Sequence, residues 1–282
     1  MTLAPTPIRW PAEAIWQAVN PLLEGFTVEI LPAVDSTNTE LMRRARAGRC
    51  EPILLVTESQ TAGRGRLGRD WVSQAGDSLT FSLGLPMAPA EWSGLSLAVG
   101  VSVAQSLQPQ LPAAGDAAPR VGLKWPNDLW LEGDRKLGGI LIETASGVGS
   151  TGPSRYVVIG VGLNVRPPDG QGLRTAPASL HDIAPALDAP TALGRIVPPL
   201  VQALQAFARH GFAAVRPQFA QRDLLQGRIV NLSDGSSGLA QGVGPDGALR
   251  VQTASGLLEV TSSEISVRPQ AAPGSIEDVR RG

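Results

Sequence analysis

The sequence predicts an α+β protein with a large mixed domain over residues 1–225, a small β-barrel over residues 226–269 and a disordered tail over residues 270–282. Three observations lead to this prediction. The chain has 282 residues, 43% of them hydrophobic, which is enough to bury the core of more than one domain. Helical and strand patterns alternate up to about residue 225. Beyond that point only short strand patterns follow, separated by turns.

The elements of the large domain follow from hydrophobic periodicity and from residues that cap helices. Apolar residues at helical spacing predict helices over residues 11–23, 39–47, 91–107 and 191–210. Apolar runs and alternation predict strands over residues 27–31, 52–58, 78–85, 121–125, 129–131, 137–143 and 156–165. Residues 35–38 offer several N-caps for the second helix, and Gly48 is a natural stop. Gly133 and Asp134 predict a tight turn between two of the strands.

The small domain is predicted from five short strand patterns over residues 228–232, 239–243, 248–253, 257–260 and 264–267. Turn sequences such as Ser233-Asp234-Gly235 separate them. Strands of this length and spacing are typical of a small barrel. Two glycine-rich or proline-rich stretches, residues 109–119 and 147–154, indicate surface loops within the large domain.

Composition narrows the classes of function and the location. The formal net charge of −1 provides no sequence-wide electrostatic reason to bind nucleic acid. No apolar run approaches the roughly 20 residues that span a membrane, and the first ten residues lack the pattern of a signal peptide. A cytoplasmic location is therefore expected. Cys50 is the only cysteine, so it cannot form an internal disulfide, and an inert thiol is expected there.

Lysine is used very sparingly. Of 24 basic residues only Lys124 and Lys136 are lysine, and the rest are arginine. A lysine carries a compact, flexible ammonium, whereas an arginine carries a planar fork. The two positions therefore indicate sites where the smaller cation is required, although two lysines must also fall somewhere by chance.

The segment Gly63-Arg64-Gly65-Arg66-Leu67-Gly68-Arg69-Asp70-Trp71 predicts an anion-binding loop. Its glycines let the backbone approach a ligand, and its arginines donate to phosphate or carboxylate. It lacks the Gly-Lys-Ser/Thr of a Walker loop and the spacing of a dinucleotide fingerprint. A basic surface loop or an RNA-binding segment are the alternatives. Clustered arginines repel one another, so the loop is expected to be disordered when empty and to order on binding.

Three further motifs carry polar residues at strand ends. In Lys124-Trp125-Pro126-Asn127-Asp128 the aspartate lies beside a lysine, which suits magnesium or nucleophile orientation. Taken alone, this run favours a turn with a surface salt bridge. In the run from Asp134 to Glu143, two glycines leave room for a ligand beside Lys136, which could neutralise a carboxylate and a phosphate in a transition state. Asn164 ends a glycine-containing strand and offers the donor and acceptor that adenine recognition needs, or serves as a turn residue.

These motifs, together with Asp35-Ser36-Thr37-Asn38 and the run from Glu58 to Arg66, resemble in their order the signature of biotin protein ligases. The resemblance covers Asp35 to Val165. It implies a fold like that of class II aminoacyl-tRNA synthetases, with a mixed, mostly antiparallel sheet flanked by helices, followed by an SH3-like barrel. It further implies that ATP and biotin are substrates with Mg²⁺, and that biotinyl-5′-adenylate forms. The acyl group then passes to a lysine of a biotin carboxyl carrier protein.

The resemblance also implies roles for single residues. Biotin-binding residues are Ser36, Thr37, Asn38, Gln60, Arg64, Gly65, Arg66 and Lys136. Nucleotide-binding residues are Arg64, Arg69, Trp71, Lys124, Asn127 and Asn164. Catalytic residues are Lys136, Arg66, Lys124 and Asp128, with Asp128 also the candidate ligand of Mg²⁺. The separate roles of Lys124 and Asp128 stay open between ATP, metal and acceptor-lysine chemistry.

Alternatives differ in their class. Some biotin protein ligases carry an N-terminal helix-turn-helix domain, but too few residues precede Asp35 here, so no DNA binding is expected. A lipoate ligase would share the fold, but it would need a long apolar tunnel. An RNA-binding protein is disfavoured by the near-neutral charge and by scarce aromatic residues. The expected assembly is a monomer or a homodimer, with no membrane contact.

Overall fold

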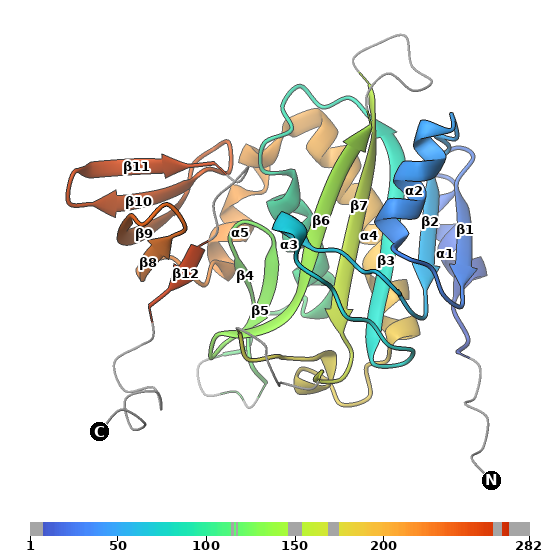
Figure 1. Ribbon diagram of the computed structural model, residues 1–282, viewed down its shortest axis with the longest axis horizontal. Coiled ribbons are helices and arrows are strands. Elements are labelled where there is room, and N and C mark those ends of the chain that lie inside the picture. The colour runs from blue at the N-terminus through green and yellow to red at the C-terminus, as the bar shows by residue number, and fades with distance from the viewer. Residues whose placement is uncertain are drawn as a thin grey trace.

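The computed structural model describes residues 8–113, 116, 118–145, 154–168, 175–261 and 267–270, and its large domain is built on a seven-stranded sheet (Figure 1). The strand order is β1-β2-β3-β7-β6-β5-β4. The strands are β1 (Thr27–Leu31), β2 (Ile53–Thr57), β3 (Ser78–Met87), β4 (Val121–Lys124), β5 (Asp128–Leu131), β6 (Arg135–Ala145) and β7 (Arg155–Asn164). Only β1 and β2 are parallel, and the other neighbours are antiparallel. The prediction of a mixed, mostly antiparallel sheet is confirmed.

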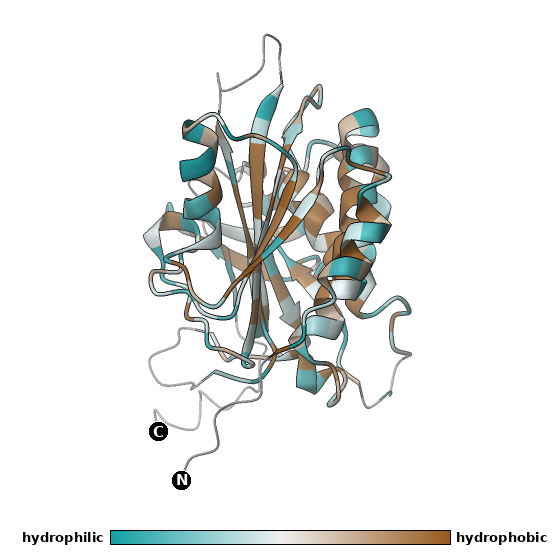
Figure 2. Ribbon diagram, turned by 90° about the vertical axis from the view of Figure 1, so that its right-hand side faces the viewer, coloured by the Kyte–Doolittle hydropathy of each residue, from teal (hydrophilic) through white to brown (hydrophobic). Residues whose placement is uncertain are grey.

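Helices cover both faces of this sheet, as the edge-on view in Figure 2 shows. They are α1 (Ala12–Val19), α2 (Thr37–Arg46), α3 (Leu95–Leu107), α4 (Ala189–His210) and α5 (Arg216–Arg222). The helix α2 packs on one face against β3, β6 and β7, while α3 and α4 pack together on the other. Helix α2 begins at the N-cap Ser36, and Gly48 follows its end with a φ of +85°. The expected helix over 91–107 begins only at Leu95, because Gly94 has the left-handed φ of +79°.

Helix α5 was not predicted from the sequence, because its seven residues carry no clear apolar period. It is anchored by Arg222, which is buried and donates from Nη1 to Val121 O at 2.9 Å. The same guanidinium donates to the carbonyl of Gln108, so it satisfies backbone groups at the start of β4 and the end of α3. The edge strand β4 is thereby tied to the segment that leads into the small domain.

The small domain is a five-stranded antiparallel sheet of order β11-β10-β9-β8-β12. Its strands are β8 (Ile229–Leu232), β9 (Ser237–Val243), β10 (Leu249–Thr253), β11 (Gly256–Val260) and β12 (Val267–Pro269). Residues 262–266 lie outside the described residues, so the expected strand over 264–267 is seen only at Val267. Residues 147–153 of the expected loop over 147–154 and residues 271–282 of the expected tail over 270–282 also lie outside them. The two domains share one apolar core, and polar contacts also join them: Trp125 Nε1 donates to Gly247 O at 3.0 Å, and Arg228 pairs with Asp134 at 2.6 and 2.7 Å.

Asp223 lies between the domains and carries a buried, unsatisfied oxygen. Its Oδ1 accepts from Leu225 N at 2.8 Å, but Oδ2 has no hydrogen-bond partner among the described residues. Burial raises the pKa of Asp223 to about 6. A carboxyl whose folded pKa exceeds its unfolded value stabilises the fold at low pH, and this contribution is lost as the pH rises through about 6.

Asp223→Asn is therefore expected to increase the free energy of unfolding at pH 8 by roughly 1–3 kcal/mol, because it removes the cost of a buried charge. The gain should disappear near pH 4. Urea unfolding at both pH values measures it, and a gain of equal size at pH 4 and pH 8 would contradict the explanation.

None of the helices in the described part of the chain combines the length and the hydropathy that crossing a bilayer requires.

Candidate active site

One face of the large sheet is lined by small and polar side chains instead of apolar ones. In β3, Thr80 and Ser82 alternate with the apolar Leu79, Phe81 and Leu83. The register of β3 and β7 sets Thr80 opposite Gly162 and Ser82 opposite Gly160. Because side chains alternate between faces of a strand, this register gathers the small and polar residues of both strands on one side. The result is a hollow in the sheet beside the start of α2.

A cavity of about 140 Å³, open to solvent on one side, lies over this hollow. It is lined by Ser36, Thr37, Asn38, Gln60, Arg64, Gly65, Arg66, Leu67, Arg69, Asp70, Trp71, Thr80, Phe81, Lys124, Pro126, Asn127, Asp128, Lys136, Gly139, Ile140, Leu141, Gly160, Val161, Gly162 and Val267. Every residue expected at the site except Asn164 is in this lining. Val267 comes from β12, so the small domain contributes to the wall.

Two glycines in β7 are required for the shape of the floor. A Cβ at Gly160 would lie 2.2 Å from Asn38 Oδ1, and a Cβ at Gly162 would lie 2.6 Å from the indole of Trp71. Neither side chain could stay in place beside an alanine. The glycines therefore let Asn38 and Trp71 lie flat against the strand.

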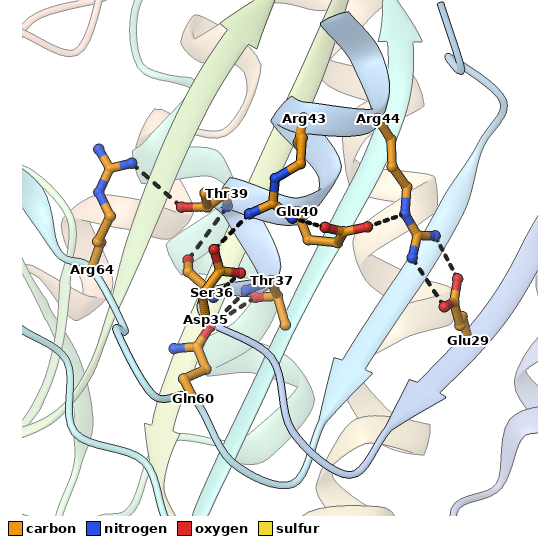
Figure 3. Close-up of polar contacts among 10 residues, drawn as sticks. All are labelled: Glu29, Asp35, Ser36, Thr37, Thr39, Glu40, Arg43, Arg44, Gln60 and Arg64. Atoms are coloured by element: carbon orange, nitrogen blue, oxygen red, sulfur yellow. Dashed lines mark hydrogen bonds and ion pairs between the residues drawn. The ribbon is translucent and has the colours of Figure 1, made fainter. Parts of the chain in front are cut away.

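At the end of the cavity beside α2, the side chains of the helix start and of Gln60 are neutral and polar. The backbone N–H of Thr37 donates to Gln60 Oε1 at 2.8 Å, and Figure 3 shows the Gln60 side chain reaching this first turn of the helix. Ser36 Oγ caps the helix by accepting from Thr39 N at 3.4 Å. Asn38 uses both ends of its amide inside the protein, on Ser82 and on Glu143. Asn38 therefore shapes the wall as a packed residue.

The glycine-arginine segment forms a hairpin-like flap over the cavity. Gly65 N donates to Arg69 O at 2.7 Å, and Trp71 N donates to Gly63 O at 2.9 Å. At its tip Leu67 has a φ of +57° and is 55% exposed. The flap is thus anchored at its base and not packed in the interior, as a segment that closes over a ligand requires. Its expected disorder in the absence of ligand stays a prediction.

Two arginines of the flap reach opposite sides of the cavity. Arg64 lies near α2, with Nη1 donating to Thr39 Oγ1 at 3.4 Å (Figure 3) and Nη2 3.6 Å from Glu143. Arg66 Nη1 donates to Asn127 Oδ1 at 3.2 Å. Asn127 is itself fixed, because its Nδ2 donates to Ile140 O at 2.7 Å. The motif that contains Asn127 therefore positions the flap arginine.

The other end of the cavity holds both lysines around one carboxylate. Lys136 Nζ lies 2.8 Å from Asp128 Oδ1, and Lys124 Nζ lies 3.6 Å from Oδ2. Burial raises the pKa of Asp128, but the charges of Lys136 and Lys124 outweigh it, so the net pKa is lowered. Burial lowers the pKa of Lys124. The Lys124 ammonium also lies over the Trp130 ring, with Nζ 4.9 Å from the ring centroid. This cluster has two cations and one anion, so it presents a net positive charge to an anionic ligand.

Asn164 is not part of the cavity lining. It is buried, and its Nδ2 donates to Ala178 O at 2.9 Å and to Lys136 O at 3.3 Å. In this arrangement it fixes the backbone of Lys136. The side chain of Asn164 is therefore not placed in the cavity, where a contact with adenine was expected.

The sequence analysis did not single out Thr80, which lines the cavity, or Ser82, which bonds to the lining residues Thr37 and Asn38. Both are buried hydroxyls in a strand whose other face is apolar, with exposed fractions of 4% and 0%. That alternation was visible in the sequence, and a polar residue at every second position of a buried strand indicates a polar site on that face. Val267 had no such signal.

The geometry gives little support to a metal role for Asp128. Both of its oxygens face lysine ammonium groups, and the described residues contain no cluster of three His, Cys, Asp or Glu side chains that could hold a metal ion. A magnesium ion is usually held through one or two carboxylates and substrate phosphates.

Comparisons with known proteins agree with this site. The model of the biotin/lipoate A/B protein ligase family matches residues 30–164, and that of the biotin protein ligase C terminal domain matches residues 227–268. The bifunctional ligase/repressor BirA of Escherichia coli K12 is 34% identical over 253 residues, which cover 87% of this chain and 75% of BirA. The chain belongs to the biotin protein ligase family.

Further members of the biotin protein ligase family extend the match to whole chains. The biotin--[acetyl-CoA-carboxylase] ligase of Paracoccus denitrificans is 29% identical and is covered over 98% of its length, with 84% of this chain. A solved structure of the biotin protein ligase from Aquifex aeolicus in complex with biotin and ATP superposes with a TM-score of 0.71 and 27% identity. This match covers 86% of this chain and 98% of that one. The resemblance inferred from the motifs is confirmed.

Proposed function

We propose that this chain is an ATP-dependent biotin protein ligase that forms biotinyl-5′-adenylate and transfers biotin to a lysine of a biotin carboxyl carrier domain. One observation carries the proposal. A single cavity has a neutral polar end at Thr37 and Gln60 and a cationic end at Lys136 and Lys124. Such a cavity suits a ligand with a polar uncharged head and a carboxylate that must meet a phosphate.

In the first half-reaction, a biotin carboxylate oxygen attacks the α-phosphorus of ATP, and pyrophosphate leaves. Two anions approach each other in this step, so stabilisation of charge is the main task of the protein. Lys136 is placed to neutralise both groups, with Asp128 holding its ammonium at 2.8 Å. Arg66, fixed by Asn127, adds a second cation from the flap. Closure of the flap would keep water from the mixed anhydride.

In the second half-reaction, the lysine amine of the acceptor attacks the acyl carbon, AMP leaves and the amine loses a proton. The open mouth of the cavity is where the acceptor lysine would enter. Lys124 and Asp128 lie beside Lys136 and are the candidates that act on ATP or on the acceptor amine. Mg²⁺ is proposed to enter with ATP as MgATP.

The proposed binding roles follow the two ends of the cavity. Ser36, Thr37, Gln60 and the backbone of Gly65 would contact the biotin head, with Asn38 shaping the wall behind it. Arg64 would close over the biotin and the adenylate phosphate. Trp71, flat on Gly162, and Arg69 would contact the nucleotide. Asn164 acts through the backbone of Lys136.

Biotin, rather than lipoate, is the proposed substrate. The first family model includes ligases for both, but the matched C-terminal model, the Paracoccus denitrificans relative and the Aquifex aeolicus structure are named for biotin. The cavity wall beside α2 also carries hydroxyl and amide groups instead of the apolar lining that a lipoyl chain would need.

The direct test is transfer of labelled biotin to a purified carrier domain. We expect covalent label only when ATP and Mg²⁺ are present, and none on a carrier domain whose acceptor lysine is replaced by arginine. A lipoate competitor should not reduce the label. Label that needs no ATP, or efficient transfer of lipoate, would contradict the proposal.

Finer properties of this ligase stay predictions. We expect no operator DNA binding and a monomer or homodimer in solution. Sedimentation with and without biotin measures the state of assembly. A biotin-dependent footprint on promoter DNA would overturn the expectation of no operator binding.

A further inference from the structure

Four polar side chains form a continuous chain of contacts from the cavity into the sheet. Gln60 Oε1 lies 3.2 Å from Thr37 Oγ1, which lies 2.7 Å from Ser82 Oγ. Ser82 Oγ in turn lies 2.6 Å from Asn38 Oδ1. Ser82 is fully buried and does not line the cavity, and Asn38 is 3% exposed. The proton positions in this chain are therefore set by the protein and not by water.

At the end of this series of contacts, the Asn38 amide has only one possible orientation. Asn38 Nδ2 lies 3.0 Å from a carboxylate oxygen of Glu143 and 3.2 Å from the carbonyl of Leu141. Both of these groups only accept hydrogen bonds. The amide nitrogen of Asn38 must therefore face them, and its oxygen must face Ser82. Since an amide oxygen cannot donate, the Ser82 hydroxyl donates to Asn38.

This direction is passed on to the cavity. A hydroxyl has a single proton, and that of Ser82 is donated to Asn38. In the bond between Thr37 and Ser82, the Thr37 hydroxyl is therefore the donor and the Ser82 oxygen is the acceptor. The lone pairs of Thr37 Oγ1 are then left for a ligand. Gln60 Oε1 is already occupied by the backbone N–H of Thr37 at 2.8 Å, which leaves the amide nitrogen of Gln60 to donate.

We infer that Ser82 and Glu143 are positioning residues that set the hydrogen-bond polarity of the head pocket, so that Thr37 accepts an N–H and Gln60 donates to a carbonyl. A cyclic urea carries this pair of groups side by side. The inference rests on the proposed function and adds to it which groups of the substrate are selected, and by which residues outside the cavity.

The test compares biotin with its two cyclic carbamate analogues, in each of which one ring N–H is replaced by oxygen. In the wild-type protein, the carbamate that places oxygen against Thr37 should bind about 30-fold more weakly than biotin, because two acceptors then face each other. In Ser82→Ala the Thr37 hydroxyl is free to donate to that oxygen. Ser82→Ala should bind biotin about tenfold more weakly than the wild type does. In this variant, the preference for biotin over the carbamate with oxygen against Thr37 should fall to about threefold.

Ser78→Ala is the matched control. Ser78 is a buried hydroxyl on the same face of β3, four residues before Ser82, and within the described residues its side chain bonds only to the backbone of Gln74. It should lower stability as much as Ser82→Ala and leave the carbamate ratio unchanged. If Ser82→Ala does not fold, Ser82→Cys carries the test. A thiol is only a weak acceptor for the Thr37 proton, so the ratio should fall in the same direction.

Calorimetric titration of each ligand measures these ratios. Equal weakening of biotin and both carbamates in Ser82→Ala, or no discrimination against either carbamate in the wild type, would overturn the inference while leaving biotin ligation intact. Failure of the wild-type protein to bind biotin at all would instead overturn the proposed function.

Discussion

Lys136→Arg is expected to lower the rate of biotin-dependent adenylate formation by about 100- to 1000-fold, the size typical for loss of one preorganised charge contact. The ammonium of Lys136 lies 2.8 Å from Asp128 Oδ1 and 3.6 Å from the position that a Cβ would take at Gly139. A planar guanidinium is wider and its charge is spread over a fork, so it would not place positive charge at the same point. Exchange of labelled pyrophosphate into ATP, with biotin present, measures the rate.

The neighbouring residue provides the control for this substitution. Arg135 pairs with Asp182 at 2.7 Å and does not line the cavity. Arg135→Lys makes the reverse exchange of cations one position away, and should change the rate by less than about twofold, since pairs of this exposure contribute little. Both variants should show the wild-type unfolding transition. Full activity of Lys136→Arg would refute the requirement for an ammonium at this position.

Gly160→Ala is expected to weaken biotin binding by about 30- to 100-fold. Its methyl group would lie 2.2 Å from Asn38 Oδ1, a side chain held by Ser82, Leu141 and Glu143. Asn38 cannot move without losing these hydrogen bonds, so the wall of the head pocket must change shape. Calorimetric titration with biotin measures the loss.

A second glycine-to-alanine variant separates this effect from a general one. A Cβ at Gly194 in α4 would lie 3.6 Å from Pro11, which is an ordinary contact. Gly194→Ala should bind biotin as the wild type does and should increase stability by about 0.5–1 kcal/mol, because alanine favours a helix over glycine. Wild-type affinity in Gly160→Ala would show that Asn38 does not shape the pocket.

Much of the site was predictable because its residues come in local runs with strong chemical character. The glycine-arginine segment could be predicted as an anion-binding flap from residue types alone, since only glycine and arginine combine close backbone approach with forked donors. The sparse use of lysine singled out Lys124 and Lys136, and the structure places both on Asp128. The turn at Gly133 and Asp134 was equally local, and both residues have the expected positive φ.

Other features depend on contacts between segments that are far apart in the chain. Asn164 was expected at the adenine, but it lies outside the cavity lining and its Nδ2 donates to the carbonyl groups of Ala178 and Lys136. The role of Ser82 arises only because the register of β3 on β7 and the packing of α2 bring Thr37 and Asn38 against it. No pattern within residues 78–87 specifies those partners.

By itself the sequence determined the class of fold, the family and the chemistry that the motif residues can perform, because periodicity, turns and residue types act over a few neighbouring positions. Only the tertiary structure decided which of those residues share one cavity, that Val267 of the small domain joins them, and which hydroxyl donates to which oxygen. The physical reason is that hydrogen-bond direction and cavity shape depend on groups more than 40 positions apart, such as Thr37 and Ser82, meeting at 2.7 Å.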